Sequence, residues 1–122
     1  MGVRGQNHQI DNIELNVADI ARSRKFYGAA FGWTFTDYGP VYCEFTDGRL
    51  TGGLTTTGPV KAGGPLVILY SENLESSVDA VTAAGGTVVE PIYAFPGGRR
   101  FHFADPAGNV LAVWSDRTTS PA

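Results

Sequence analysis

Hydrophobic and polar residues alternate near the start of the chain, and a helical pattern follows. Ile13, Leu15 and Val17 alternate with polar residues, so one face of this strand is apolar and the other polar. Asp19 can cap the following helix by accepting backbone N–H groups. Gly32 can end it, because glycine enters the left-handed conformation without a Cβ clash. The pattern predicts a half-buried strand followed by a capped helix.

The same order of elements recurs in the second half of the chain. Residues 66–70 form an apolar strand, Asn73 stands at the helix cap, and Gly85-Gly86 closes the helix. Three strand-like stretches follow each helix: residues 34–36, 41–46 and 50–55, then residues 87–92, 100–104 and 110–115. Asp47-Gly48 predicts a two-residue hairpin turn, and Asp105–Asn109 predicts a longer one. Each half is therefore expected to be a βαβββ module.

The length of the chain fits one domain. It has 122 residues, and a domain usually has about 100–200. We expect a single domain over 1–122, with module one at about 10–57, a Gly- and Pro-rich linker at 58–65, and module two at about 66–116.

Charge and composition exclude several classes of protein. Nine Lys and Arg against twelve Asp and Glu give a net charge of −3, which argues against a nucleic-acid binder. No apolar run approaches the roughly 18 residues of a membrane helix, and Met1–Gln6 has no signal-peptide core. The single cysteine, Cys43, excludes an internal disulfide and a Cys-based zinc site, and its apolar surroundings predict a core thiol. We therefore expect a cytoplasmic protein without nucleic-acid or membrane partners.

Two motifs carry a family resemblance. The first runs from Asp19-Ile20 through Phe26-Tyr27-Gly-Ala-Ala-Phe31-Gly32-Trp33, and the second is Phe103-Ala-Asp105-Pro106-Ala-Gly108-Asn109. In this order, with the repeat around them, they resemble the vicinal oxygen chelate superfamily of glyoxalase I, bleomycin-resistance proteins and extradiol dioxygenases. The resemblance covers about Ile10 to Asp116. It implies an α+β fold in which two tandem βαβββ modules form curved mixed sheets around a cleft, with helices outside, and it implies a homodimer.

The same resemblance implies where a metal would bind. Enzymes of this superfamily hold a divalent ion with His and Glu side chains, at positions matched here by Asn12, Leu66 and Ala112. An Asn carbonyl alone is a weak neutral donor and the other two side chains donate nothing, whereas a catalytic site needs about three ligands. We therefore expect no metal and no cofactor. Whether the chain is an enzyme, as lactoylglutathione lyases and dioxygenases of this fold are, stays open.

Two ionisable residues are weak catalytic candidates. If the late hairpin closes symmetrically, His102 lies opposite Ala112 on the cleft side, where it can donate a hydrogen bond or act as a base; the alternative is a histidine satisfied by backbone or water. Glu14 can contact a ligand or act as a base; the alternative is a solvated carboxylate. An irregular metal site of Glu14, Glu44 and His102 is a further alternative.

Aromatic residues are the other candidates for ligand contact. By the family comparison, metal-free members bind flat or hydrophobic molecules by stacking, and Tyr70 and Trp114 share the strand alternation of the cleft positions. Trp33 is interpreted as a plug between helix and sheet. Residues 93–100 are expected to form a flexible loop over the cleft, with Arg99 or Arg100 available for an anionic group. The expected ligand site comprises Asn12, Glu14, Tyr42, Glu44, Leu66, Ile68, Tyr70, His102, Ala112 and Trp114.

These observations favour a metal-independent binding protein that sequesters or carries a hydrophobic or aromatic organic ligand. The first alternative is a glyoxalase-like lyase, isomerase or dioxygenase with a non-standard metal or acid/base site. The second is an interaction module whose cleft is filled by its own side chains.

Overall fold

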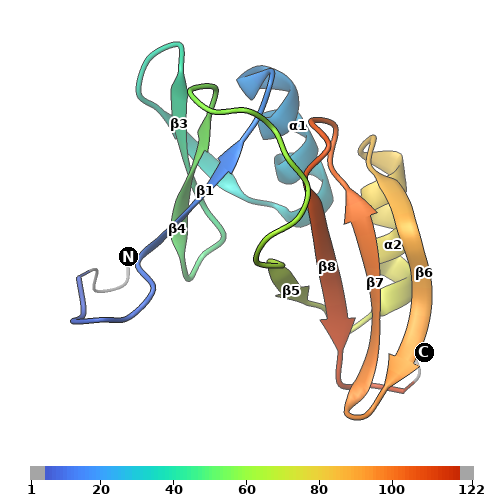
Figure 1. The fold of residues 1–122 in the computed structure, drawn as a ribbon. Helices are drawn as coiled ribbons and strands as arrows, with labels where there is room; N and C mark the ends of the chain where they lie inside the picture. Colours follow the sequence, from blue (N-terminus) through green and yellow to red (C-terminus); the bar gives the residue numbers. More distant parts are fainter. Residues whose placement is uncertain (1–4, 119–122) are drawn as a thin grey trace.

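The computed structural model describes residues 5–118, so most of Met1–Gln6 lies outside the described residues. The elements occur in the order β1 (Asn12–Asn16), α1 (Ile20–Phe31), β2 (Thr34–Asp37), β3 (Tyr42–Thr46), β4 (Thr51–Thr55), β5 (Ile68–Tyr70), α2 (Leu74–Ala83), β6 (Thr87–Phe95), β7 (Gly98–Ala104) and β8 (Val110–Ser115) (Figure 1). This is an α+β fold in which the βαβββ unit occurs twice, as the sequence pattern predicts. No helix in residues 5–118 is long and apolar enough to cross a membrane.

Each module forms its own sheet. The strand order is β1-β4-β3-β2 in the first four-stranded sheet and β5-β8-β7-β6 in the second. The pairs β1/β4 and β5/β8 are parallel and the others antiparallel, so both sheets are mixed. Because β1 and β5 are the first strands of their modules and pair on one side only, both sheets have an edge at their first strand.

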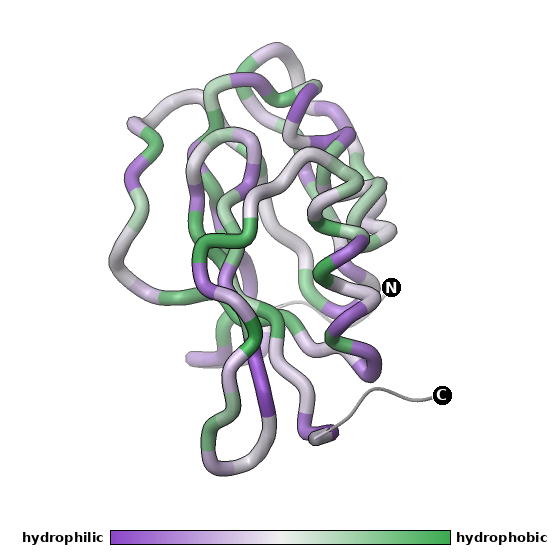
Figure 2. The backbone as a smooth tube through the Cα atoms, turned by 90° about the vertical axis from the view of Figure 1, so that its right-hand side faces the viewer, coloured by the Kyte–Doolittle hydropathy of each residue, from purple (hydrophilic) through white to green (hydrophobic). Residues whose placement is uncertain are grey.

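The helices begin and end at the residues that their capping patterns predict. The Asp19 carboxylate accepts the N–H of Arg22 at 3.1 Å, and Gly32 ends α1 with a φ of 73°. The Asn73 side chain caps α2 by accepting the N–H of Ser76 at 3.0 Å. The C-cap residue of α2 is Ala84, and Gly85, which has a left-handed backbone conformation, follows it. Green and purple segments alternate along the helices in Figure 2, as expected for helices with one apolar face.

The first hairpin turn is longer than predicted. Thr46 pairs with Thr51, so residues 47–50 form the loop. The prediction of a two-residue turn at Asp47-Gly48 is therefore wrong. The Asp47 carboxylate accepts the backbone N–H groups of Arg49 and Leu50 at 2.8 and 2.7 Å. This side chain satisfies two backbone donors within the loop, and it thereby stabilises the wider turn.

The prediction of a flexible loop at residues 93–100 is also wrong, because this segment is a β-hairpin. β6 runs on to Phe95, β7 begins at Gly98, and these two residues pair across the Pro96–Gly97 turn. Gly98 is required by close packing: a Cβ atom there would lie 1.9 Å from the Ser115 carbonyl oxygen of β8. In the sequence, Pro96, Gly97 and Gly98 suggest a loop. In the structure, Pro96 and Gly97 form a tight turn, and Gly98 allows β7 to lie close to β8.

The hydrophobic core joins the two modules. Phe26 of α1 packs against Phe103 of β7, with ring centroids 6.0 Å apart, and both side chains are buried. The Tyr27 hydroxyl donates to the buried Asp105 carboxylate at 2.7 Å. The Asn109 side-chain amide donates to the backbone oxygen of Asn16 at 2.8 Å. Module one is thus held against the β7–β8 hairpin of module two, which sets the geometry of the space between the sheets.

Candidate ligand-binding site

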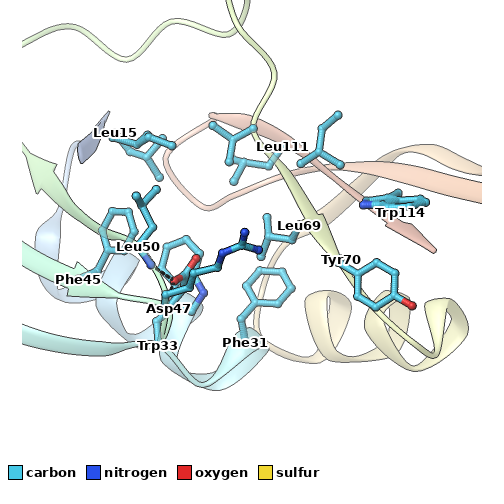
Figure 3. A pocket seen from close by; sticks show the side chains of 14 residues that line it. Leu15, Phe31, Trp33, Phe45, Asp47, Leu50, Leu69, Tyr70, Leu111 and Trp114 are labelled. Carbon is cyan, nitrogen blue, oxygen red and sulfur yellow. Dashed lines mark hydrogen bonds between the residues drawn. The ribbon is translucent and has the colours of Figure 1, made fainter. Parts of the chain in front are cut away.

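A hollow of about 660 Å³ lies between the two modules. Ligand sites commonly measure about 300–1,000 Å³. In Figure 3, Leu15, Phe45 and Leu50 lie toward the left of the hollow, and Leu69, Tyr70 and Trp114 lie toward the right. Both modules therefore contribute to the lining, and most of it is apolar or aromatic.

Stacked aromatic rings form one wall of this hollow. The Trp33 indole lies 4.5 Å from the Tyr27 ring at an interplanar angle of 7°, and 4.4 Å from the Phe45 ring at 13°. Phe31 adds a tilted ring 6.1 Å from Trp33. Each such pair contributes about 0.5–1.5 kcal/mol beyond area burial, so the ring contacts stabilise this wall. Trp33 is 8% and Phe45 4% exposed, so the wall is closely packed, and Phe31, Trp33 and Phe45 belong to the lining of the hollow.

Tyr70 and Trp114 lie at the opposite side. They pair across β5 and β8, and their rings meet edge to face at 5.3 Å. The Tyr70 side chain is 49% exposed, and its hydroxyl donates to Asp116 at 2.6 Å. That hydrogen bond raises the pKa of the Tyr70 phenol. A flat guest entering from this side meets two partly exposed rings.

Four of the expected site residues gather on the polar face of the first sheet. Tyr42 lies over Gly53, where an added Cβ atom would meet its hydroxyl oxygen at 2.1 Å. Partial burial and then a hydrogen bond with Glu14 raise the pKa of the Tyr42 phenol, while Asn12 lowers it and the charge of Glu44 raises it. These side chains are therefore neighbours. Asn12, Tyr42 and Glu44 do not belong to the lining of the 660 Å³ hollow.

The other six expected residues lie on or beside β5, β7 and β8. The register places His102 opposite Ala112 and Ala112 opposite Ile68, as symmetric closure of the late hairpin predicts. The His102 Nε2 atom shares a hydrogen bond of 3.1 Å with the Tyr93 hydroxyl. Ile68, Tyr70 and Trp114 line the main hollow, whereas His102 and Ala112 do not.

A second hollow of about 590 Å³ lies beside the linker. It brings Glu14 of the first sheet together with Leu66 and Ile68 of the second module, and Lys61 adds a cation from the linker. Three of the expected site residues, one from the first module and two from the second, thus line this second hollow. Cys43 lies elsewhere: it is fully buried, as expected for a core thiol, and burial raises its pKa.

A family model matches residues 9–113, and its description is Glyoxalase/Bleomycin resistance protein/Dioxygenase superfamily. The chain belongs to this superfamily. The match covers both βαβββ modules and agrees with the resemblance that the two sequence motifs indicate.

Individual proteins of known name are also similar to this superfamily member. A curated relative, the anthracycline biosynthesis protein DnrV of Streptomyces peucetius, is 32% identical, and the match covers 83% of this chain and 44% of DnrV. The chain thus spans less than half the length of that relative. A glyoxalase-related enzyme from Fulvimarina pelagi has a similar fold, with a TM-score of 0.75, 22% identity and 88% of each chain covered. TnmS3, an antibiotic binding protein from Streptomyces sp. CB03234, has a TM-score of 0.72 and 18% identity, with 88% of this chain and 94% of TnmS3 covered.

The donor set does not fit the catalytic metal of the superfamily's enzymes. The positions that the family resemblance matches to the metal ligands hold Asn12, Leu66 and Ala112. In the part of the chain that the structure describes, no three His, Cys, Asp or Glu side chains are grouped so that they could hold an ion. Glu14 and Glu44 lie on the first sheet and His102 on the second, and they form no such group among residues 5–118, so the irregular site considered above is not assembled within one chain.

The sequence interpretation missed much of the hollow's lining. Leu15, Phe45 and Leu111 lie on the apolar faces of their strands, where alternation is typical of core. Trp33 does pack between helix and sheet, at 8% exposure, but it also lines the hollow. No local pattern shows that part of an apolar face is left uncovered, because that depends on how the two modules pack together.

Proposed function

We propose that this superfamily member binds a flat, hydrophobic organic molecule between its two modules, without a metal, and sequesters or carries it. The hollow of about 660 Å³ is the observation that carries the proposal. Its stacked wall around Trp33 and its exposed pair of Tyr70 and Trp114 offer aromatic surfaces on two sides. Asp47 and Arg49 are the charged groups in its described lining, which suits a largely apolar guest.

The named relatives support an organic ligand of the antibiotic kind. TnmS3 is an antibiotic binding protein of similar fold, and DnrV is an anthracycline biosynthesis protein. A guest that buries about 200 Å² of apolar surface gains roughly 5 kcal/mol from leaving water. Stacking adds about 0.5–1.5 kcal/mol per pair, and lost freedom on binding offsets part of the total. We expect dissociation constants in the micromolar range for matched ligands.

Intrinsic fluorescence tests this proposal directly, because the chain has two tryptophans, Trp33 and Trp114, and both line the hollow. The protein is treated with a chelator and titrated with anthraquinone, an anthracycline and a linear aliphatic amide. We expect saturable quenching by the aromatic compounds and none by the amide. Calorimetry gives the stoichiometry, and chromatography of the recovered ligand separates binding from turnover.

Two results would contradict the proposal. Absence of saturable quenching across the panel would mean that the hollow is not a ligand site. Quenching that disappears with the chelator and returns with a divalent ion would show that binding needs a metal. A chemically changed ligand would instead favour the enzymatic alternative, with Glu14 or His102 as the acid or base.

We also propose a homodimer in which the remaining expected residues complete a shared cleft. Ile68 and Tyr70 of β5 are 42% and 49% exposed, and Leu66, two residues before the strand, is 36% exposed, which is an unusual concentration of apolar surface. β1 and β5 both have an open edge. A second copy could cover these surfaces and bring the polar group around Glu14 opposite His102. Light scattering should give about twice the 13.0 kDa mass of the chain; a monomer at micromolar concentration would refute this.

A cytoplasmic location is part of the same proposal. The buried Cys43 thiol has no disulfide partner in the chain, which suits a reducing compartment. Cell fractionation of a tagged protein tests it, and recovery in the culture medium would contradict it.

A further inference from the structure

Arg100 lies among aromatic rings on the face of the second sheet that also carries Trp114. The carbon of its guanidinium is 5.5 Å from the centroid of the Tyr93 ring and 5.6 Å from that of the Phe95 ring. Its Nε donates to the Tyr93 hydroxyl. The Phe95 ring in turn lies 6.4 Å from that of Trp114. We call Tyr93, Phe95, Arg100 and Trp114 the Arg100 patch.

Within the described residues 5–118, no carboxylate pairs with Arg100. Elsewhere in the described residues, Arg24 pairs with Asp37 at 2.8 Å and Arg99 pairs with Glu75 at 2.7 Å. Arg100 is half-buried, yet between residues 5 and 118 it makes no ion pair, and its two terminal nitrogens make no hydrogen bond. By register Glu90 stands opposite His102, and Asp116 lies two residues beyond Trp114 and accepts from the Tyr70 hydroxyl, so neither acid stands directly opposite Arg100.

A guanidinium in this state is prepared to bind an anion. The rings of Tyr93 and Phe95 and the Tyr93 hydroxyl hold the Arg100 side chain in place, so it loses little conformational freedom when a ligand binds. The two free terminal nitrogens can donate side by side to a carboxylate. The Tyr93 hydroxyl also bonds to His102 Nε2 at 3.1 Å, so both residues position Arg100.

The Arg100 patch is continuous with the hollow. Arg100 pairs with Trp114, and Trp114 pairs with Tyr70, so the three residues lie in one row across β7, β8 and β5. Trp114 and Tyr70 line the hollow. Neighbouring strands are about 4.8 Å apart. A ring stacked on Trp114 therefore brings a substituent on its edge within reach of Arg100.

We propose that the ligand is an aromatic acid, whose ring lies against Trp114 and whose carboxylate or acidic phenol binds Arg100. This inference rests on the proposed function and names the chemical class of the ligand. The aromatic wall of the hollow accepts any flat guest, and Arg100 selects those that carry a negative charge.

Two ligands that differ only in charge test the inference. Anthracene-2-carboxylate and anthracene-2-carboxamide share their rings and nearly their shape, and their dissociation constants are measured at pH 7.5 by calorimetry. The wild-type protein should bind the carboxylate at least about tenfold more tightly. Arg100→Gln should reduce this ratio to near one. Arg99→Gln is the matched control and should keep the ratio, because the adjacent Arg99 pairs with Glu75.

The outcomes separate this inference from the proposed function. If neither compound binds, the proposed function fails and the inference fails with it. If both bind equally well to the wild type, or if Arg100→Gln keeps the preference, the ligand site stands and the role of Arg100 is wrong. Should the Gln variant lose its folded circular dichroism, Arg100→Met keeps the stem that packs on Phe95 and removes the charge. If Arg100→Met still prefers the carboxylate over the carboxamide, the inference is likewise overturned.

Discussion

At the scale of single residues, the buried Asp105 carboxylate forms a polar link between the modules. It is 4% exposed, and its Oδ1 accepts the backbone N–H groups of Ala107, Gly108 and Asn109 at 3.0, 2.9 and 2.9 Å. Its Oδ2 accepts from the Tyr27 hydroxyl and from the Asn109 amide. A buried carboxylate is tolerated only when its acceptor sites are filled in this way.

Removing the Tyr27 hydroxyl should therefore lower stability. Tyr27→Phe keeps the stacked ring beside Trp33 but deprives Asp105 of its shortest hydrogen bond. We expect the free energy of unfolding in urea to fall by about 1.5–3 kcal/mol, the range for hydrogen bonds to charged groups. Tyr38→Phe is the control and should change nothing, because Tyr38 is 61% exposed. Equal stability of the two variants would show that the bond to Asp105 contributes nothing.

The same hydroxyl predicts a loss of stability at alkaline pH. Burial, and then the Asp105 charge, raise the pKa of Tyr27 above its usual value near 10. Above pH 10 the unfolded chain loses this proton while the folded protein keeps it, so stability falls as pH rises, by at most about 1.4 kcal/mol per pH unit. Urea unfolding between pH 9 and 11 should show a shallower decline for Tyr27→Phe than for the wild type. Parallel declines would assign the effect to other groups.

At the scale of elements, two glycines should respond in opposite ways to an added methyl group. A Cβ atom on Gly98 would lie 1.9 Å from the Ser115 carbonyl, so Gly98→Ala must separate β7 from β8 and should cost about 1–3 kcal/mol. At Gly28 of α1 the nearest atom is at 3.6 Å, and alanine is the better helix former. Gly28→Ala should therefore raise stability by about 0.5–1 kcal/mol. Thermal unfolding of both variants checks the pair; destabilisation of both would refute the packing argument.

Local patterns predicted most elements because their causes are local. The caps Asp19 and Asn73 act on backbone groups of the next helical turn. The predictions that failed depended on contacts distant in sequence. Gly98 is a glycine because β8 passes close to it, and a pattern confined to residues 93–100 does not contain β8.

At the scale of the whole molecule, the candidate site depends on how one module lies against the other. The contacts that fix this arrangement, Phe26 with Phe103 and Tyr27 with Asp105, join residues on different modules. The sequence indicated which strand faces are apolar, and it predicted Tyr70 and Trp114 as ligand contacts; both line the hollow. It could not indicate that Leu15 and Phe45 face an open space, because strands that border a filled core and strands that border a hollow show the same alternation of apolar and polar residues.

Filling that space should weaken binding without unfolding the protein. Leu15 lines both hollows and is only partly buried, so Leu15→Trp has room to place its ring where a guest would lie. We expect calorimetry with anthraquinone to show an affinity at least about tenfold weaker, since the guest loses the stacking and burial that drive its entry. Val89→Trp is the matched control: Val89 is 50% exposed on β6, lines neither hollow, and should keep wild-type affinity. Unchanged affinity in Leu15→Trp would place the guest elsewhere, with the polar face around Glu14 and Tyr42 as the next surface to vary.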